Sequence, residues 1–221
     1  MHPSKAPGPD GLSAGFFQQH QNIVGHSVSA ACLEILNGDG DLSLINHTYV
    51  ALIPKVKEPT RVSEYRPISM CNIIYKIISK CLTNRPKIVL EHLISPYQSS
   101  FIPQRIITDN IIIGYECLHK IRCRKQGKEG LVAVKLDNIK AYDRIEWCFV
   151  EIIMHELGFS YRWVSLTMKC IMLSTFFFLL NGEVRGLVKP QRGLHKDVLF
   201  PLIYLFYVQN LYLLYWPMQK S

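Results

Sequence analysis

Residues 134–143 read Val-Lys-Leu-Asp-Asn-Ile-Lys-Ala-Tyr-Asp, a strand-like pattern that leads to a carboxylate. Apolar side chains occupy every second position before Asp137, which predicts a strand over Leu131–Asp137. A helix is predicted to follow from about Arg144 to Leu157, with Gly158 as its stop. A carboxylate at the end of a buried strand is costly unless it is solvated, paired or bound to a cation. Asp137 could therefore hold a hard divalent ion, although such aspartates more often serve as caps.

Periodic apolar patterns elsewhere predict both helices and strands, in an order that fits a mixed α/β (α+β) fold rather than a regular βαβ array. Residues 5–11 (Lys-Ala-Pro-Gly-Pro-Asp-Gly) predict a loop, because proline fixes φ and glycine permits a positive φ. Asn181-Gly182 is the strongest two-residue signal for a hairpin turn. The other predicted elements are a helix ending at Asn37-Gly38-Asp39-Gly40, a strand over Thr48–Pro54, helices from Asn72 and over Asn110–Arg124, and hairpin strands over Phe176–Leu180 and Glu183–Val188.

Helical spacing also predicts which side chains face the core. Pro86 is expected to end the helix that starts at Asn72 or to start the next one, because proline lacks a backbone donor. The predicted inward residues are Ile73, Ile74, Ile77, Ile78, Cys81 and Leu82 in that helix, and Ile145, Phe149, Ile152 and Ile153 in the later one.

The composition is globular and basic. Hydrophobic residues make up 48% of the 221 residues, which is enough for one domain or two small ones. Twenty-five Lys and Arg against 17 Asp and Glu give a formal net charge of +8, which suits nucleic acid or an anionic membrane surface. Val198–Met218 is uncharged and long enough to span a bilayer, but it contains two prolines, and a buried core segment would read the same way.

Most common enzyme signatures are absent from the sequence. The seven cysteines are scattered and form no C-x-x-C pair, so neither a zinc site nor a disulfide framework is indicated, and buried reduced thiols are expected. The histidines show no H-E-x-x-H spacing, and no G-x-S-x-G or G-x-x-x-x-G-K-[ST] string occurs.

The stretch 134–143 resembles the first catalytic motif of reverse transcriptases from plant LINE-type (non-LTR) retrotransposons. Other strings are similar to the same family and follow the family's order, over roughly residues 5–211. So many strings in one order make a chance match negligible. They are Lys5–Gly11, Asn46-His-Thr48, Leu52-Ile-Pro-Lys55, Tyr65-Arg-Pro-Ile-Ser69, Tyr75-Lys-Ile-Ile-Ser-Lys80, Gln98-Ser-Ser-Phe101, Ile107-Thr-Asp-Asn110, Leu180-Asn-Gly182 and Arg192-Gly-Leu194.

The resemblance implies an RNA-directed DNA polymerase with right-hand architecture, of which this chain carries the fingers and a partial palm, with the thumb absent. Residues 1–125 would be the fingers and connecting helices, 126–211 the partial palm and 212–221 an unmatched tail. The implied partners are an RNA template and a DNA primer, and the implied cofactor is Mg²⁺. No protein partner is indicated, a membrane is not expected, and the expected location is the cytoplasm or nucleus.

Three residues near the key stretch acquire roles from the resemblance. Asp137 matches the family's first metal-binding aspartate, which serves two-metal nucleotidyl transfer. Tyr142 matches the aromatic residue that stacks under the incoming sugar and disfavours a 2′-hydroxyl, whereas by pattern alone it is a core aromatic in a first helical turn. Asp143 is also similar to a family residue, but a helix N-cap role suits it better than metal binding.

The resemblance also implies roles for two cations and for three residues along the template path. Lys55 and Arg66 match the fingers positions that face the triphosphate of the incoming nucleotide, where cations neutralise phosphate charge. Gln98, Phe101 and Arg105 lie in a segment that lines the template path, with Arg105 expected to contact a backbone phosphate.

Several departures from the family pattern bear on activity. The family places an aromatic-x-Asp-Asp hairpin after about residue 211, and this string does not occur in the chain. Gln104 replaces a usual glycine, and Pro86 replaces a usual leucine where an unbroken helix would lose about 3 kcal/mol. Arg192–Asp197 lacks a glycine and has Lys196 instead of glutamine. We therefore expect a truncated copy that does not polymerise.

Two alternatives stay open at this point. The chain could be a non-catalytic RNA-binding remnant that uses the fingers residues and the basic run Lys120–Lys128. It could also be a membrane-associated protein that inserts Val198–Met218.

Overall fold

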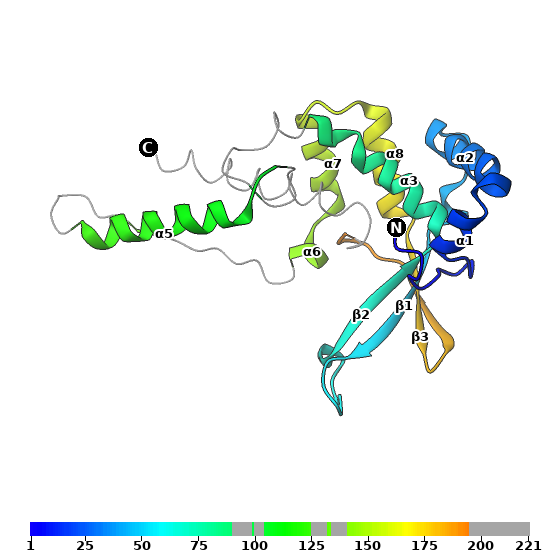
Figure 1. Cartoon of the computed structure of the whole chain (residues 1–221), viewed down its shortest axis with the longest axis horizontal. Helices are drawn as coiled ribbons and strands as arrows, with labels where there is room; N and C mark the ends of the chain where they lie inside the picture. Colours follow the sequence, from blue (N-terminus) through cyan, green and yellow to red (C-terminus); the bar gives the residue numbers. More distant parts are fainter. Residues whose placement is uncertain (90–98, 100–103, 125–131, 134–140, 195–221) are drawn as a thin grey trace.

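The computed structural model describes residues 1–89, 99, 104–124, 132–133 and 141–194. Asp137, Gln98 and Phe101 lie outside the described residues, together with most of the predicted strand Leu131–Asp137 and the apolar stretch Val198–Met218. In the described part, several helices gather around one core and a sheet extends away from them (Figure 1).

The sheet has four strands in the order β2-β1-β3-β4. Strand β1 (His47–Pro54) pairs antiparallel with β2 (Tyr65–Cys71) and parallel with β3 (Thr175–Leu180), which turns back into the antiparallel β4 (Glu183–Val188). The predicted strand over Thr48–Pro54 and both predicted hairpin strands are confirmed. Strand β2 contains Pro67, which argues against a central strand but is tolerated here because β2 is an edge strand.

Local turn chemistry behaves as the sequence predicted. Asn181 and Gly182 have φ values of 52° and 83°, and a type I′ hairpin turn requires positive φ at both positions. Helices α1 (Ala14–Gln19) and α2 (Gln21–Asn37) replace the one predicted helix, with a break at His20. Helix α2 ends at Gly38, whose φ of 96° confirms the predicted stop.

Three helices supply most of the core, namely α3 (Ile73–Asn84), α7 (Trp147–Glu156) and α8 (Tyr161–Met172). Helix α3 ends before Pro86, which opens the short 3₁₀ turn η3 (Pro86–Ile88), so the proline interrupts no helix. Two further 3₁₀ turns are η1 (Leu42–Leu44) and η2 (Val62–Glu64). The fully buried side chains include Ile78, Leu82, Ile145, Met154 and Val164.

Helix α5 (Ile107–Cys123) confirms the predicted helix over Asn110–Arg124, with an earlier start. It extends away from the other helices in Figure 1, and none of its side chains is buried. Across the described ranges, no helix combines the length and the apolar character that crossing a bilayer requires.

The helix predicted from Arg144 to Leu157 differs in three respects. It is split into α6 (Ala141–Arg144) and α7, with Ile145 buried in the break. Ile152 was expected to face inward but is 58% exposed, because Val150, Ile153 and Met154 form the buried face of α7. Asp143 is the third residue of α6, so the predicted N-cap role is wrong. The predicted stop at Gly158 is confirmed by its φ of 79°.

The N-terminal residues confirm the predicted loop and are tied to the body. The Asp10 amide donates to Asn72 Oδ1 at 3.1 Å, and the Gly15 amide donates to the Pro3 carbonyl at 3.2 Å. Gly8 is buried where this loop crosses the end of β2. A Cβ added at Gly8 would lie 2.5 Å from the Asn72 nitrogen and 2.5 Å from the Cys71 carbonyl carbon.

We expect Gly8→Ala to lower the free energy of unfolding by about 1–3 kcal/mol, because backbone atoms must shift to admit the methyl group. Gly25→Ala is the control, since a Cβ there meets only Gln21 Cγ at 3.5 Å, and alanine favours a helix by up to about 1 kcal/mol. Urea denaturation followed by circular dichroism measures both. Equal free energies of unfolding for the two variants would contradict the close packing of the N-terminal loop against Cys71 and Asn72.

The cysteines divide into two classes. No disulfide joins them in the described residues, but only some are buried, so the expectation of buried thiols is partly wrong. Burial raises the pKa of Cys170 to about 12, and burial followed by the neighbouring Cys81 raises the pKa of Cys32. The buried class is Cys32, Cys71 and Cys170, and the exposed class is Cys81, Cys117, Cys123 and Cys148.

We expect iodoacetamide at pH 8 to modify the exposed class in the folded protein and all seven cysteines in denaturant. The buried thiols are shielded from the reagent, and the high pKa of Cys170 keeps its reactive thiolate scarce. Peptide mass spectrometry after timed labelling gives the rate at each site. Rapid modification of Cys170 in the folded protein would contradict the packing of α8.

Candidate nucleic-acid interface

The β1–β2 hairpin brings two of the predicted site residues together. Ile53 lies directly opposite Arg66, so these two side chains share one face of the sheet. Lys55 continues the pairing beyond β1, because its amide donates to the Glu64 carbonyl at 2.8 Å. Alternation along the chain places Lys55 on the same face as Ile53, and therefore on the face of Arg66.

The loop that joins the two strands is held by a carboxylate. Glu64 Oε2 accepts hydrogen bonds from the Thr60 and Arg61 amides at 2.7 Å and 3.1 Å. Lys55 Nζ donates to the Ser63 carbonyl at 2.7 Å, which leaves its other ammonium protons pointing to solvent. The loop therefore has a defined shape that sets the direction of Lys55.

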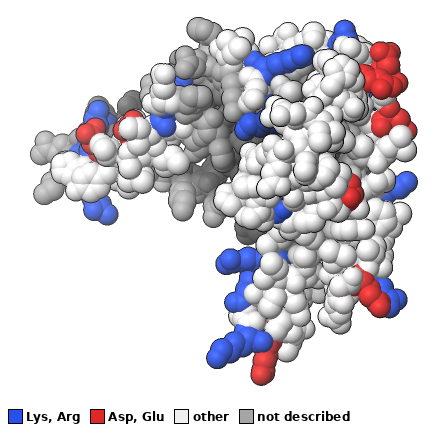
Figure 2. All heavy atoms as spheres, turned by 45° about the vertical axis from the view of Figure 1, so that its right-hand side comes forward, with Lys and Arg blue, Asp and Glu red and all other residues white. Residues whose placement is uncertain are grey.

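This hairpin is predominantly basic. Lys55, Lys57, Arg61 and Arg66 are all exposed, against Glu58 and the half-buried Glu64. Figure 2 shows Lys and Arg side chains gathered on the lower lobe, over the strands that extend from the helices. Among the described residues, neither Lys55 nor Arg66 forms a salt bridge. The hairpin therefore carries an excess of positive charge, which suits phosphate groups.

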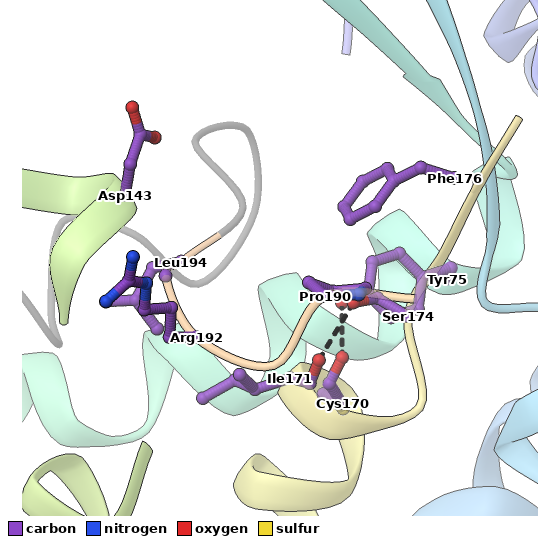
Figure 3. Close-up of a pocket in the computed structure, with 10 residues that line it drawn as sticks. Tyr75, Asp143, Cys170, Ile171, Ser174, Phe176, Pro190, Arg192 and Leu194 are labelled. Atoms are coloured by element: carbon purple, nitrogen blue, oxygen red, sulfur yellow. Dashed lines mark hydrogen bonds between the residues drawn. The ribbon is translucent and has the colours of Figure 1, made fainter. Parts of the chain in front are cut away.

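A small cavity of about 190 Å³ lies beside Asp143, the last residue of the stretch 134–143 (Figure 3). Asp143 from α6 lines it together with Arg192, Gly193 and Leu194, which belong to the loop after β4. In Figure 3 the Asp143 carboxylate is directed away from Arg192. The other lining residues are Tyr75, Cys170, Ile171, Ser174, Phe176 and Pro190.

Backbone contacts hold that loop in place. The Gly193 amide donates to the Ile145 carbonyl at 2.8 Å, and Trp147 Nε1 donates to the Gly193 carbonyl at 2.8 Å. Arg192 lies 3.8 Å from Glu146 in an exposed ion pair. Asp143, at the end of the stretch 134–143, and residues 192–194, from a string that the sequence marked separately, thus meet around one cavity.

The other predicted site residues are only partly placed. Tyr142 belongs to α6, but its side chain lies outside the described residues. Arg105 is half-buried just before α5, next to Gln104, whose φ of 67° is a conformation that favours glycine. This backbone agrees with the glycine expected at position 104. In the described ranges, no group of three or more His, Cys, Asp or Glu residues is arranged to hold a metal ion.

Sequence reasoning missed Lys57 and Arg61, which accompany Lys55 and Arg66 on the hairpin. Both lie between the two strings that mark the strands, in a segment (residues 56–64) whose two basic residues are balanced by Glu58 and Glu64, so no signal for them was present in the sequence. Only the pairing of β1 with β2 shows that Lys57 and Arg61 lie on the same hairpin as Lys55 and Arg66.

Comparisons with known proteins agree with the strings identified in the sequence. The family model for reverse transcriptase (RNA-dependent DNA polymerase) matches residues 53–195, which include the hairpin cations from Lys55 to Arg66 and the residues that line the cavity at Asp143. The chain is also similar to the transposon TX1 uncharacterized 149 kDa protein of Xenopus laevis, with 33% identity over 147 residues. That match covers 66% of this chain and 11% of the length of the relative. The chain belongs to the reverse transcriptase (RNA-dependent DNA polymerase) family.

Proposed function

We propose that this chain forms the fingers and part of the palm of an RNA-directed DNA polymerase from a plant LINE-type (non-LTR) retrotransposon. The ordered strings and the similarity to a transposon protein support the proposal. The proposed division places fingers and connecting helices in residues 1–125 and the partial palm in 126–211. The four-stranded sheet draws β1 and β2 from the first range and β3 and β4 from the second.

The observation that carries the proposal is the shared face of Lys55 and Arg66. Two exposed cations without salt-bridge partners among the described residues lie on one face of a hairpin with a fixed loop. A triphosphate carries several negative charges within a few ångströms, and two cations on one face neutralise it better than one. Arg66 can also donate two parallel hydrogen bonds to a phosphate.

Tyr142 and Asp137 complete the proposed nucleotide site. The ring of Tyr142 would exclude a 2′-hydroxyl by steric contact, so that deoxynucleotides are selected. Carboxylate oxygens are ligands that Mg²⁺ prefers, so Asp137 is the residue that would hold the ion. Bound Mg²⁺ would neutralise charge that develops on the phosphates. Gln98, Phe101 and Arg105 would line the template path.

Removing both hairpin cations is expected to weaken nucleotide binding. We expect Lys55→Gln with Arg66→Gln to reduce the affinity for a fluorescent deoxyadenosine triphosphate on the order of tenfold, because charge-assisted hydrogen bonds are lost. Arg185→Gln is the matched control on the same sheet, since Arg185 already pairs with Glu183 at 2.6 Å. Fluorescence anisotropy measures the affinities. An equal loss in the control would show that the hairpin has no special role.

The 221-residue polypeptide itself is expected to synthesise no DNA. Its sequence contains no two adjacent aspartates, and one aspartate cannot hold two metal ions against their mutual repulsion. Primer extension on an RNA template with deoxynucleotides and Mg²⁺ tests this, with an active reverse transcriptase as positive control. A product that disappears with Asp137→Asn would overturn the expectation. RNA binding without synthesis would favour the alternative function of a non-catalytic RNA-binding module, which the basic hairpin equally supports.

A further inference from the structure

A histidine and a cysteine form a close pair on the exposed helix α5. His119 and Cys123 have H-x-x-x-C spacing, which on a helix places both side chains on one face. Cys123 Sγ lies 3.6 Å from His119 Nε2 and 3.8 Å from His119 Nδ1. Both side chains are exposed, and α5 extends away from the other helices (Figure 1). An ion from solvent can therefore reach the sulfur and a ring nitrogen together.

The separation of these atoms matches the spacing of two ligands on one zinc ion. Zinc binds cysteine sulfur at about 2.3 Å and histidine nitrogen at about 2.0–2.1 Å, with tetrahedral geometry. Two such bonds at the tetrahedral angle hold the sulfur and the nitrogen roughly 3.5 Å apart. The 3.6 Å between Cys123 Sγ and His119 Nε2 is almost the same distance. The helix therefore spaces the two ligand atoms correctly before any ion binds.

The surroundings of the pair also favour a bound cation. The Tyr115 ring stacks on the His119 ring, with 6.4 Å between the centroids and 22° between the planes, which limits the orientations of the imidazole. Cys123 is the last residue of α5, where carbonyl groups form the negative end of the helix dipole. Lys120 and Arg122 lie in the same turn, and a thiolate on the ion would lower the positive charge beside them.

We propose that His119 and Cys123 chelate one thiophilic divalent metal ion, with Zn²⁺ as the best match. Cys123 binds as a thiolate and releases its proton to solvent, while neutral His119 donates the lone pair of one ring nitrogen. Among the described residues no third His, Cys, Asp or Glu is grouped with the pair, and water is the proposed ligand at the other positions. Thiolate and imidazole suit zinc, whereas Mg²⁺ suits oxygen ligands. The proposal is therefore independent of the polymerase function.

Helix α5 itself supplies a matched control for the test. Cys117 is a second exposed thiol on this helix, but the positions four residues before and after it are Ile113 and Ile121, which bind no metal. The full 221-residue chain is reduced, freed of metal with a chelator and titrated with Co²⁺. A bond between Co²⁺ and a thiolate gives a charge-transfer absorption in the near ultraviolet, so the titration detects a sulfur ligand directly.

We expect the absorption to saturate at one Co²⁺ per chain in the unchanged protein and in Cys117→Ser, and Zn²⁺ but not Mg²⁺ to displace the ion. Cys123→Ser is expected to abolish the absorption. His119→Gln is expected to keep it but to weaken Co²⁺ binding at least about tenfold, since even residues outside the ligand set change metal affinity by that factor. In a second measurement, Zn²⁺ should protect Cys123 from iodoacetamide and leave Cys117 reactive.

Three results would overturn the metal site. The first is that the unchanged protein shows no charge-transfer absorption. The second is an equal loss of absorption in Cys117→Ser and Cys123→Ser, which would mean that Co²⁺ binds exposed thiols without selection. The third is an unchanged affinity in His119→Gln, which would exclude the imidazole as a ligand. Helix α5 buries no side chain, so the variants are expected to remain folded, and circular dichroism spectra check this.

Discussion

One buried carbonyl oxygen joins the sheet to the helices. The Cys170 carbonyl lies in the last turn of α8, where helix carbonyls lack partners within the helix. Asn46 Nδ2 donates to it at 2.9 Å and Tyr75 Oη at 3.0 Å. Burial raises the pKa of Tyr75 well above its usual value, so the phenol keeps the proton that it donates. An unsatisfied buried acceptor costs about 1–3 kcal/mol, so the positions of β1, α3 and α8 depend on one another.

The sheet takes its direction from this junction. The Thr175 amide donates to the Asn46 carbonyl at 3.0 Å, and β3 then runs parallel to β1. Thr48 and Val50 of β1 are buried near the helices, whereas Ile53 and Pro54 are exposed at the far end. The strands thus lead from a packed base to a solvated tip (Figure 1). Cations at such a tip keep their hydration and remain accessible to phosphates.

A second polar side chain, that of Asn72, ties the N-terminal loop to the body. Asn72 follows β2 directly, donates to the Ile45 carbonyl at 3.0 Å and accepts from the Asp10 amide at 3.1 Å. One side chain therefore fixes the start of α3, the segment before β1 and the N-terminal loop. The N-terminal loop, β2 and α3 line one groove of about 600 Å³, and this amide helps to hold the loop beside the helix.

The sequence by itself determined the features that depend on neighbouring residues. Asn181-Gly182, Gly38 and Gly158 mark turns and helix ends correctly, because backbone torsional preferences act within a few residues. The ordered strings likewise identified the family. These strings are short and contiguous, so no knowledge of the fold was needed to read them.

Tertiary structure alone decided which distant residues meet. The parallel pairing of β1 with β3, the exposure of Ile152 and the place of Asp143 in α6 depend on contacts across the whole chain. Strand β2 escaped prediction because Pro67 opposes a strand locally, while its position at the sheet edge removes the penalty. Lys5 and Lys76 are far apart in the sequence. They line one groove only because the fold places the N-terminal loop beside α3.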